Sequence, residues 1–273
     1  MQATWTVNGA AGGVDPADRG LAYGDGLFET MAAAEGAVPL LDYHLERLAI
    51  GCDRLAIPVP DLAGLRREID RGTPARGRAI VKVIVTRGSA ARGYTPPDDP
   101  SPNVLIGSLP WLAPPAAHYT QGIELATCEL RLGENPKLAG LKHLCRLEQV
   151  MAQLELKARG FREGLLLSAS GLVVGGTSSN VFAVAGGCVY TPQIDRCGVS
   201  GVMRRVVLET CATLRLPRAE TDMGLETLRQ ADEVFFTNAV LGLRPVGRLD
   251  DVTYPVGPVT RAIRARLGAA EDV

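Results

Sequence analysis

Apolar residues recur along this chain with helical spacing in some stretches and form short continuous runs in others. Residues 42–57 predict an amphipathic helix that Pro58 ends, and residues 146–159 predict a second helix that Gly160 ends. The apolar stripe of the first helix, which we expect to face a core, comprises Leu45, Leu48, Cys52 and Leu55. The stripe of the second helix comprises Leu147, Val150, Met151 and Leu154.

Runs rich in β-branched residues predict the strands. Residues 79–86 are apolar almost throughout, interrupted by Lys82, which fits a strand buried on both faces. Further strands are predicted at residues 5–7, 26–34, 164–168, 180–184 and 233–237. Strand and helix signals therefore mix along the whole chain.

The segment Leu109–Pro115 contains three prolines in seven residues, and it cannot continue a helix or a central strand. We therefore place a linker at residues 109–115, between a small N-terminal domain (residues 1–108) and a larger C-terminal domain (residues 116–273). Together these signals predict an α+β fold with two mixed α/β domains and an active site in the cleft between them.

Composition narrows the range of partners and locations. The 273 residues carry a formal net charge of -1 with arginines scattered among acids, so neither a nucleic-acid nor a membrane surface is indicated. The polar start has no basic leader region, and no apolar run reaches the roughly 18 residues of a membrane span. Six widely spaced cysteines and three distant histidines favour reduced thiols and no metal site. We expect a cytoplasmic protein with a small-molecule partner.

Lys142 is the strongest candidate for chemistry. Only four of the 29 basic residues are lysines, and this one stands shortly before the predicted helix at residues 146–159. An arginine stays protonated, whereas a partly desolvated lysine can form a Schiff base with a carbonyl group. This points to carbonyl or pyridoxal phosphate chemistry, although the local sequence also fits an exposed lysine at the start of a helix.

A second candidate is the segment Gly198–Arg205, which opens another predicted helix. Glycine lets the backbone approach a ligand closely, and free amides at a helix N-terminus form an anion site. Alternatively, Ser200 simply caps the helix, as serine does in many helices that bind nothing. Spacing alone leaves both interpretations open.

Several segments considered together carry a family resemblance: residues 19–30 (RGLAYGDGLFET), 44–48 (HLERL), 135–150, 198–204 (GVSGVMR) and Thr237-Asn238. They resemble the fold-type IV pyridoxal-phosphate enzymes, a family that includes branched-chain and D-amino-acid aminotransferases and 4-amino-4-deoxychorismate lyase. The resemblance implies a pyridoxal 5′-phosphate cofactor attached to Lys142 and a homodimer. It also implies that the cofactor phosphate is held by Arg47, Ser200, Gly201, Thr237 and Asn238.

Two segments are similar to the lyase members of the family: residues 135–150 (NPKLAGLKHLCRLEQV) and residues 86–94 (TRGSAARGY). Cys145 departs from the lyase pattern, which usually has asparagine there. The similarity implies elimination of pyruvate from 4-amino-4-deoxychorismate to give 4-aminobenzoate, for folate synthesis. Arg87, Arg92 and Tyr94 would then contact the substrate, because arginines suit its carboxylates. An aminotransferase of the same fold is the alternative.

Gly175 is the main departure from the family pattern, within the segment VVGGTSSNVF at residues 173–182. The family has a glutamate there that faces the pyridine nitrogen of the cofactor and helps the ring to act as an electron sink. Water or a nearby hydroxyl group such as that of Thr177 could partly replace this carboxylate, and Gly175→Glu is expected to speed the reaction. The departure also leaves open a repurposed or catalytically impaired homologue.

Overall fold

The computed structural model describes residues 3–268 and divides the chain into two compact units. The first unit extends to Leu112 and also contains Leu141–Cys145, whereas the second contains Ala113–Gly140 and the chain from Arg146 onward. Each unit has helices packed on a sheet of its own, which confirms the predicted α+β class. No pattern in the sequence predicts that Leu141–Cys145 belongs to the first unit.

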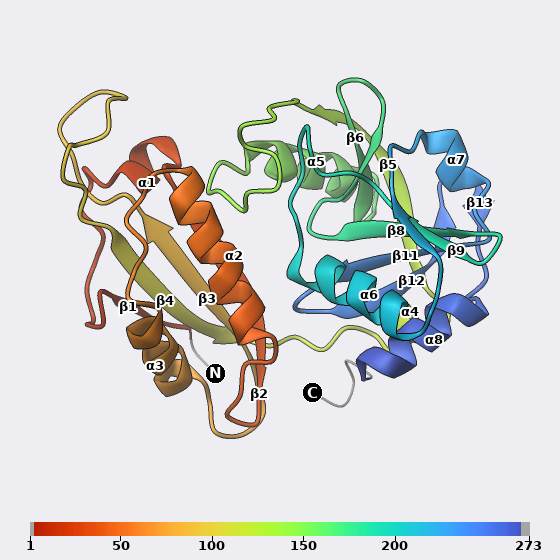
Figure 1. Cartoon of the computed structure of the whole chain (residues 1–273), viewed down its shortest axis with the longest axis horizontal. Helices are drawn as coiled ribbons and strands as arrows, with labels where there is room; N and C mark the ends of the chain where they lie inside the picture. Colours follow the sequence, from red (N-terminus) through yellow and green to blue (C-terminus); the bar gives the residue numbers. More distant parts are fainter. Residues whose placement is uncertain (1–2, 269–273) are drawn as a thin grey trace. The chain divides into compact units, whose positions relative to one another are not determined.

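The first unit is a four-stranded antiparallel sheet with helices on one face (Figure 1). Its strands are β1 (Thr4–Val7), β2 (Gly26–Ala34), β3 (Arg78–Thr86) and β4 (Asn103–Pro110). Its helices are α1 (Arg19–Tyr23), α2 (Leu41–Arg54) and α3 (Leu62–Gly72). The strand order β1-β4-β3-β2 leaves β2 at an edge, where another segment can pair with it.

The predicted strands at residues 26–34 and 79–86 correspond to β2 and β3, but β3 is not buried on both faces. Its residues alternate between buried and half-buried, so that Val81 and Val83 belong to the core while Lys82 lies on the other face. The expectation of a doubly buried strand is wrong, because helices cover only one face of this antiparallel sheet.

The second unit is built on a nine-stranded mixed sheet with the order β10-β9-β8-β11-β12-β5-β6-β7, and β13 pairs with β12. Its strands are β5 (Ile123–Leu132), β6 (Gly164–Ser168), β7 (Val173–Gly176), β8 (Asn180–Ala185), β9 (Cys188–Thr191), β10 (Arg218–Glu220), β11 (Glu233–Asn238), β12 (Gly242–Leu249) and β13 (Val252–Thr253). Its helices are α4 (Ala117–Thr120), α5 (Leu147–Ala158), α6 (Val202–Thr213), α7 (Leu225–Arg229) and α8 (Pro258–Leu267).

The core of this unit lies on both faces of the central strand β11. The rings of Phe182 and Phe235 stack on one face with their centroids 4.9 Å apart, in a cluster that also contains Val207 of α6 and Ile263 of α8. Phe236 packs in a separate cluster on the other face. Both ends of β11 are thereby fixed, including the carboxyl end that carries Thr237 and Asn238.

The second predicted helix corresponds to α5, but its apolar stripe does not face a core. Leu147, Val150, Met151 and Leu154 are all exposed, and the buried face consists of Ala152 and Leu156. A small residue and a single leucine suffice there because α5 packs closely on β5 and on Gly164, where an added Cβ would lie 2.6 Å from Leu156. Among the described residues, no helix is long and apolar enough to cross a membrane.

The two faces of α5 predict opposite results for two leucine truncations. Leu156→Ala removes a fully buried side chain and should lower the free energy of unfolding by about 2–5 kcal/mol. Leu154→Ala, its matched control on the exposed face, should change it by about 0.5 kcal/mol or less. Urea unfolding of both variants measures this, and equal losses would contradict the assignment of the faces.

Candidate active site

Lys142 lies in an extended segment paired with the edge strand β2, not at the start of a helix. The Phe28 N–H donates to the Lys142 carbonyl oxygen at 3.0 Å, and the Leu144 N–H donates to the Gly26 carbonyl oxygen at 3.0 Å. The pairing fixes the backbone from the Lys142 carbonyl group to Leu144, and α5 begins only at Leu147. The interpretation of Lys142 as an exposed helix-start lysine is therefore wrong.

The Lys142 side chain is half-buried against an aromatic ring. Its Nζ atom lies 4.3 Å from the centroid of the Phe28 ring, and Nζ of Lys82 lies 5.2 Å from the same centroid. The ring shields the amine from water on one side, which suits a lysine that must act as a nucleophile. Lys82 is the second amine at this place and is the natural competitor in any labelling experiment.

Gly24 allows the end of the Lys142 segment to approach α1. It caps α1 with a φ of +67°, and a Cβ at this position would lie 2.4 Å from Sγ of Cys145. The thiol Sγ lies 3.4 Å from the Tyr23 carbonyl oxygen. Cys145, which departs from the lyase pattern, therefore lies in close contact with Gly24 of the 19–30 segment.

Arg47 lies on α2 and forms a two-pronged ion pair with buried Glu29 of β2. Its Nε donates to Glu29 Oε1 at 2.8 Å, and its Nη2 contacts Oε2. His44 Nδ1 is 2.6 Å from Oε2 of the same carboxylate. Glu29 thus orients the Arg47 guanidinium.

The pKa of Glu29 lies below its ordinary value of 4.5. Burial by itself would raise it, but the hydrogen bond from His44 and the charge and hydrogen bonds of Arg47 outweigh burial. A depressed pKa means that the stabilisation is complete above about pH 4.5 and is lost as the pH falls through the folded-state value.

We therefore expect Glu29→Gln to lower the free energy of unfolding by about 3 kcal/mol near pH 7, because Arg47 and His44 lose a buried carboxylate partner. The difference between the variant and the wild type should shrink as the pH falls below about 4.5 and then through the lowered folded-state pKa of Glu29, because the wild-type carboxyl group then becomes protonated in the folded state as well. Urea unfolding at several pH values measures it. A difference that stays constant with pH would show that the carboxylate charge is unimportant.

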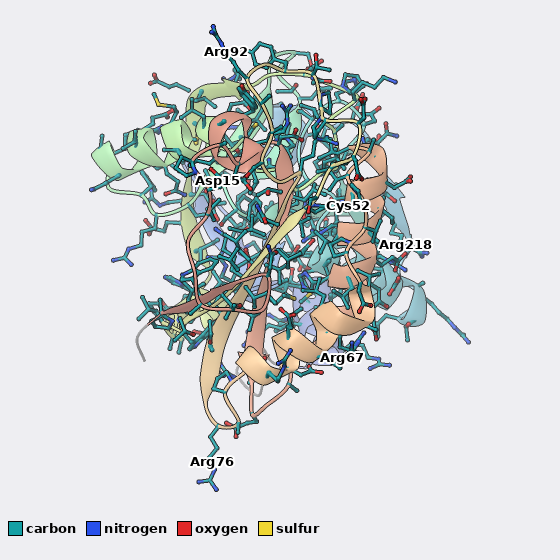
Figure 2. The ribbon with its side chains drawn as sticks, turned by 90° about the vertical axis from the view of Figure 1, so that its left-hand side faces the viewer. Asp15, Cys52, Arg67, Arg76, Arg92 and Arg218 are labelled. Atoms are coloured by element: carbon teal, nitrogen blue, oxygen red, sulfur yellow. The ribbon has the colours of Figure 1, made fainter. Side chains whose placement is uncertain are left out.

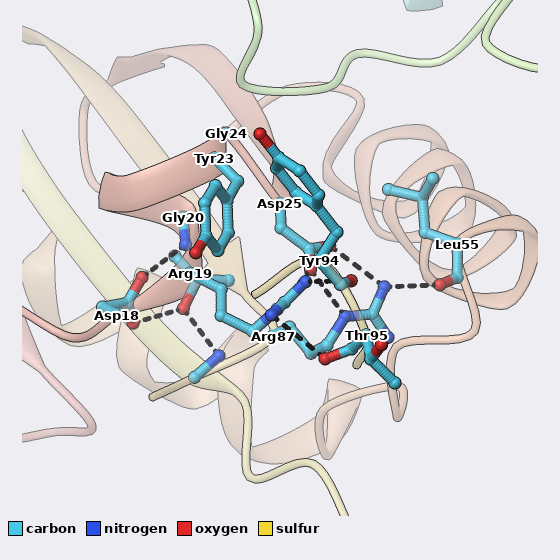
Figure 3. A network of polar contacts seen from close by, with 12 residues as sticks. Asp18, Arg19, Gly20, Tyr23, Gly24, Asp25, Leu55, Arg87, Tyr94 and Thr95 are labelled. Carbon is cyan, nitrogen blue, oxygen red and sulfur yellow. Dashed lines mark hydrogen bonds and ion pairs between the residues drawn. The ribbon is translucent and has the colours of Figure 1, made fainter. Parts of the chain in front are cut away.

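Arg87 is a structural residue in this fold, which corrects its expected contact with substrate. Nε and Nη2 bind both oxygens of Asp25, and Nη1 and Nη2 also donate to the carbonyl oxygens of Ala56 and Leu55 (Figure 3). Burial raises the pKa of Asp25, but its bonds to Arg87 and Arg19 outweigh burial and bring the pKa below 3.8. Because Nε, Nη1 and Nη2 all donate within the protein, Arg87 has no free pair of N–H donors for a substrate carboxylate.

The loop that follows β3 is held at its base by Arg19 and presents Arg92 and Tyr94 to solvent. Arg19 is buried and donates to the carbonyl oxygens of Gly93 and Tyr94 at 2.9 Å each. The Tyr94 side chain is 85% exposed, and Figure 2 shows Arg92 extending outward from the ribbon. Both side chains are accessible, and their contact with substrate stays a prediction.

In the second unit, Thr237 and Gly201 come together around Asn180. Thr237 pairs with Asn180 across β11 and β8, and a Cβ on Gly201 would lie 2.0 Å from Asn180 Oδ1. Among the described residues, the fully buried Thr237 Oγ1 has no hydrogen-bond partner. No side chain caps α6, which begins directly after Gly201. An unpaired hydroxyl group near uncapped helix amides fits a phosphate.

Two other predicted phosphate ligands have different roles. The Ser200 N–H donates to the Gly140 carbonyl oxygen at 3.1 Å, and the N-cap of α6 is Gly201, so Ser200 is neither the cap nor a free amide. Asn238 Oδ1 accepts from the N–H groups of Val240 and Leu241. These bonds make the Asn238 side chain part of the turn between β11 and β12, and they correct its expected role as a side-chain ligand.

Gly175 stands where a side chain would be strained. A Cβ there would lie 2.8 Å from the Ser179 carbonyl oxygen, so Gly175→Glu would disturb the backbone as well as add a carboxylate. Thr177 cannot replace that carboxylate, because its hydroxyl group donates to Glu163 and accepts from Gln153 Nε2 at 2.6 Å. The expectation that Gly175→Glu simply speeds the reaction no longer follows.

Three acids that organise these networks were not evident from the sequence: buried Glu29 and Glu163, and partly buried Asp25. Asp25 and Glu29 lie within the 19–30 segment, and a charged residue at an inward position of β2 is a signal for Glu29. Nothing in the local pattern marks Glu163, whose partners come from residues 177–179 and from Arg244.

A half-buried lysine, an arginine oriented by a buried acid, and an unpaired hydroxyl group beside a helix N-terminus fit an enzyme that binds a phosphorylated aldehyde cofactor. The chain belongs to the amino-transferase class IV family, whose model matches residues 26–249. The aminodeoxychorismate lyase of Vibrio harveyi is 34% identical over 254 residues, which cover 92% of this chain and 94% of that protein.

Solved structures show the same relationship. The 4-amino-4-deoxychorismate lyase from Pseudomonas aeruginosa is 46% identical in sequence with a TM-score of 0.92, over 97% of this chain and 98% of that one. The branched-chain amino acid aminotransferase of Escherichia coli is 25% identical with a TM-score of 0.85, over 94% of this chain and 89% of that one. These comparisons confirm the fold-type IV resemblance.

Proposed function

We propose that this protein is a 4-amino-4-deoxychorismate lyase that uses pyridoxal 5′-phosphate and releases 4-aminobenzoate and pyruvate. The observation that carries the proposal is the likeness to the Pseudomonas aeruginosa lyase over nearly the whole of both chains. The placement of Lys142 against Phe28 supports it independently, since the reaction requires a positioned amine.

Each unit offers candidate contacts to the cofactor. Lys142 would attach to the cofactor aldehyde, and Arg47, oriented by Glu29, would bind the phosphate. Thr237 Oγ1 and the first amides of α6, next to Gly201, complete the phosphate ligands. Ser200 and Asn238 would contribute through backbone placement rather than through direct contacts.

When bound, the cofactor supplies an electron sink that stores the charge left after a proton is removed. The Lys142 amine would take the proton from C4 of the substrate. Cleavage of the C3–O bond then releases enolpyruvate, and the ring that remains becomes aromatic. Phe28 restricts access of water to one side of Nζ and keeps the amine where the proton leaves. Arg92, which lies in the loop after β3, would bind a carboxylate of the substrate.

An aminotransferase is the second candidate, favoured by the likeness to the Escherichia coli branched-chain enzyme. It would use Lys142 in the same position, but it would require a keto acid as the amino acceptor. The lyase is preferred because the segments at residues 86–94 and 135–150 resemble that enzyme. We also propose a homodimer and a cytoplasmic location, which rest on the family resemblance.

The function is tested by pyruvate release from 4-amino-4-deoxychorismate, compared with transamination of branched-chain and D-amino acids. We expect pyruvate release to dominate, and Lys142→Ala to lower kcat by at least about 10³-fold. Lys137→Ala, which changes an exposed lysine of the preceding loop, is the matched control and should keep full activity. Faster transamination than pyruvate release would reverse the choice between the two enzymes.

Borohydride reduction of the loaded protein tests the assignment of Lys142 without any substrate. Peptide mass spectrometry should find the phosphopyridoxyl group on Lys142, because this amine is held against Phe28 by paired backbone. The same group on Lys82, whose amine lies near the same ring, would contradict the assignment.

Arg92→Ala should raise KM for the lyase substrate by about 10-fold or more, because a charge-assisted bond to a carboxylate contributes about 1.5–3 kcal/mol. Its kcat should change by less than about 3-fold, since this arginine would bind substrate and transition state alike. Arg76→Ala removes an exposed arginine elsewhere in the same unit and serves as the control. Unchanged KM for Arg92→Ala would remove this residue from the substrate site.

A further inference from the structure

Asp25, which directly precedes β2, joins two buried arginines through a single carboxylate (Figure 3). Arg19 Nε donates to its Oδ2 at 2.9 Å, and Arg87 Nε donates to the same oxygen at 2.8 Å. Arg87 Nη2 also donates to Oδ1 at 3.0 Å. The side chains of the two arginines are only 5% and 7% exposed. Two cations thus share one anion, and each needs it to offset a buried charge.

The other donors of Arg19 hold the loop that follows β3. Its Nη1 and Nη2 donate to the carbonyl oxygens of Gly93 and Tyr94, respectively, at 2.9 Å each. Nη1 also donates to the carbonyl oxygen of Thr95 at 3.4 Å. These three residues come directly after Arg92, so one guanidinium fixes the backbone beside the arginine that we expect to contact substrate.

Arg87 attaches the same carboxylate to the end of α2. Its Nη1 donates to the Ala56 carbonyl oxygen at 2.7 Å, and its Nη2 donates to that of Leu55 at 2.8 Å. Ala56 has a φ of +50°, which a residue other than glycine rarely adopts, so these bonds stabilise an unusual turn. Asp25, Arg19 and Arg87 together form a clamp between a packed helix end and an exposed loop.

Removal of the charge at Asp25 would leave two guanidinium groups close together without an anion. Buried like charges repel each other, so one of the two arginines must then move toward water. Arg19 is the one that can move, because its partners lie in a loop where the Tyr94 side chain is 85% exposed. The partners of Arg87 end a helix that packs on β2. Movement of Arg19 would release the loop.

We propose that Asp25 is a positioning residue for substrate binding: by holding Arg19 against the loop, it keeps Arg92 in one place before substrate arrives. A loop that is already ordered loses little conformational entropy on binding, so the clamp lowers the KM for substrate. The inference rests on the proposed function for the identity of the substrate and for the role of Arg92. The clamp itself consists of residues of the first unit alone.

Trypsin digestion of the full chain tests the clamp without any substrate. Arg92 and Arg76 are both exposed loop arginines followed by glycine, so their peptide bonds are matched. Asp25→Asn should speed cleavage after Arg92 by at least about 10-fold, because the Gly93 carbonyl group is no longer held. Cleavage after Arg76, which lies outside the clamp, should change by less than about 2-fold. A rate at Arg92 that rises no more than the rate at Arg76 would overturn the proposal.

Arg19→Lys carries the test if thermal melts show that Asp25→Asn does not fold. A lysine keeps the positive charge beside Asp25, but it lacks the planar fork that reaches three carbonyl groups, so cleavage after Arg92 should again rise selectively. Asp250→Asn is the matched control. The half-buried Asp250 accepts from the N–H of Thr127 at 2.8 Å and from its hydroxyl group at 2.7 Å, in the other unit. It should keep the wild-type ratio of the two cleavage rates.

Steady-state kinetics connect the clamp with substrate. Asp25→Asn should raise the KM for 4-amino-4-deoxychorismate by about 5-fold or more and change kcat by less than about 3-fold. Because Asp25 acts through Arg92, the double variant Asp25→Asn/Arg92→Ala should have a KM within about 2-fold of that of Arg92→Ala alone. Effects on KM that multiply, or a KM that Asp25→Asn leaves unchanged, would overturn the proposal. A wild type that releases no pyruvate would overturn the proposed function instead, and trypsin digestion would still decide whether the clamp exists.

Discussion

The pairing of Leu141–Cys145 with the edge of β2 is the constraint on which the chemistry of the first unit depends. Two backbone hydrogen bonds, one at the Lys142 carbonyl oxygen and one at the Leu144 N–H, fix Lys142 beside Phe28. Side chains alternate along a strand, so Phe28 supports the lysine on one face while the adjacent Glu29 orients Arg47 on the other. An edge strand that would otherwise expose unpaired amides thereby positions the Lys142 amine.

Buried carboxylates paired with arginine recur in both units. Asp25 binds Arg19 and Arg87, Glu29 binds Arg47, and Glu163 lies beside Arg244. A guanidinium presents several donors in a fixed plane, so it can satisfy a carboxylate and backbone carbonyl groups at once. Arg19 and Arg87 accordingly hold backbone carbonyl groups as well as Asp25.

Such networks are costly to break because each one contains a charge that water cannot reach. In the first unit they hold the loop after β3 and the base of α1. In the second unit the same principle fixes the turn at residues 177–179 against the end of β11. Buried polar contacts thus set the backbone conformation of these segments in both units.

The sequence by itself determined the elements with strong periodicity or β-branched runs: β2 and β6 have the predicted bounds, and α2, α5, β8 and β11 lie within one to three residues of theirs. It also indicated candidates for the site: Lys142 as a rare lysine, Gly201 in a glycine-containing helix start, and Thr237 through the family resemblance. Tertiary structure alone decided that the apolar stripe of α5 is exposed to solvent. It also decided that Arg87, Ser200 and Asn238 form hydrogen bonds within the protein. The reason is that a hydrogen-bond partner distant in sequence leaves no periodic trace, whereas the burial of a helix face or a strand repeats along the chain.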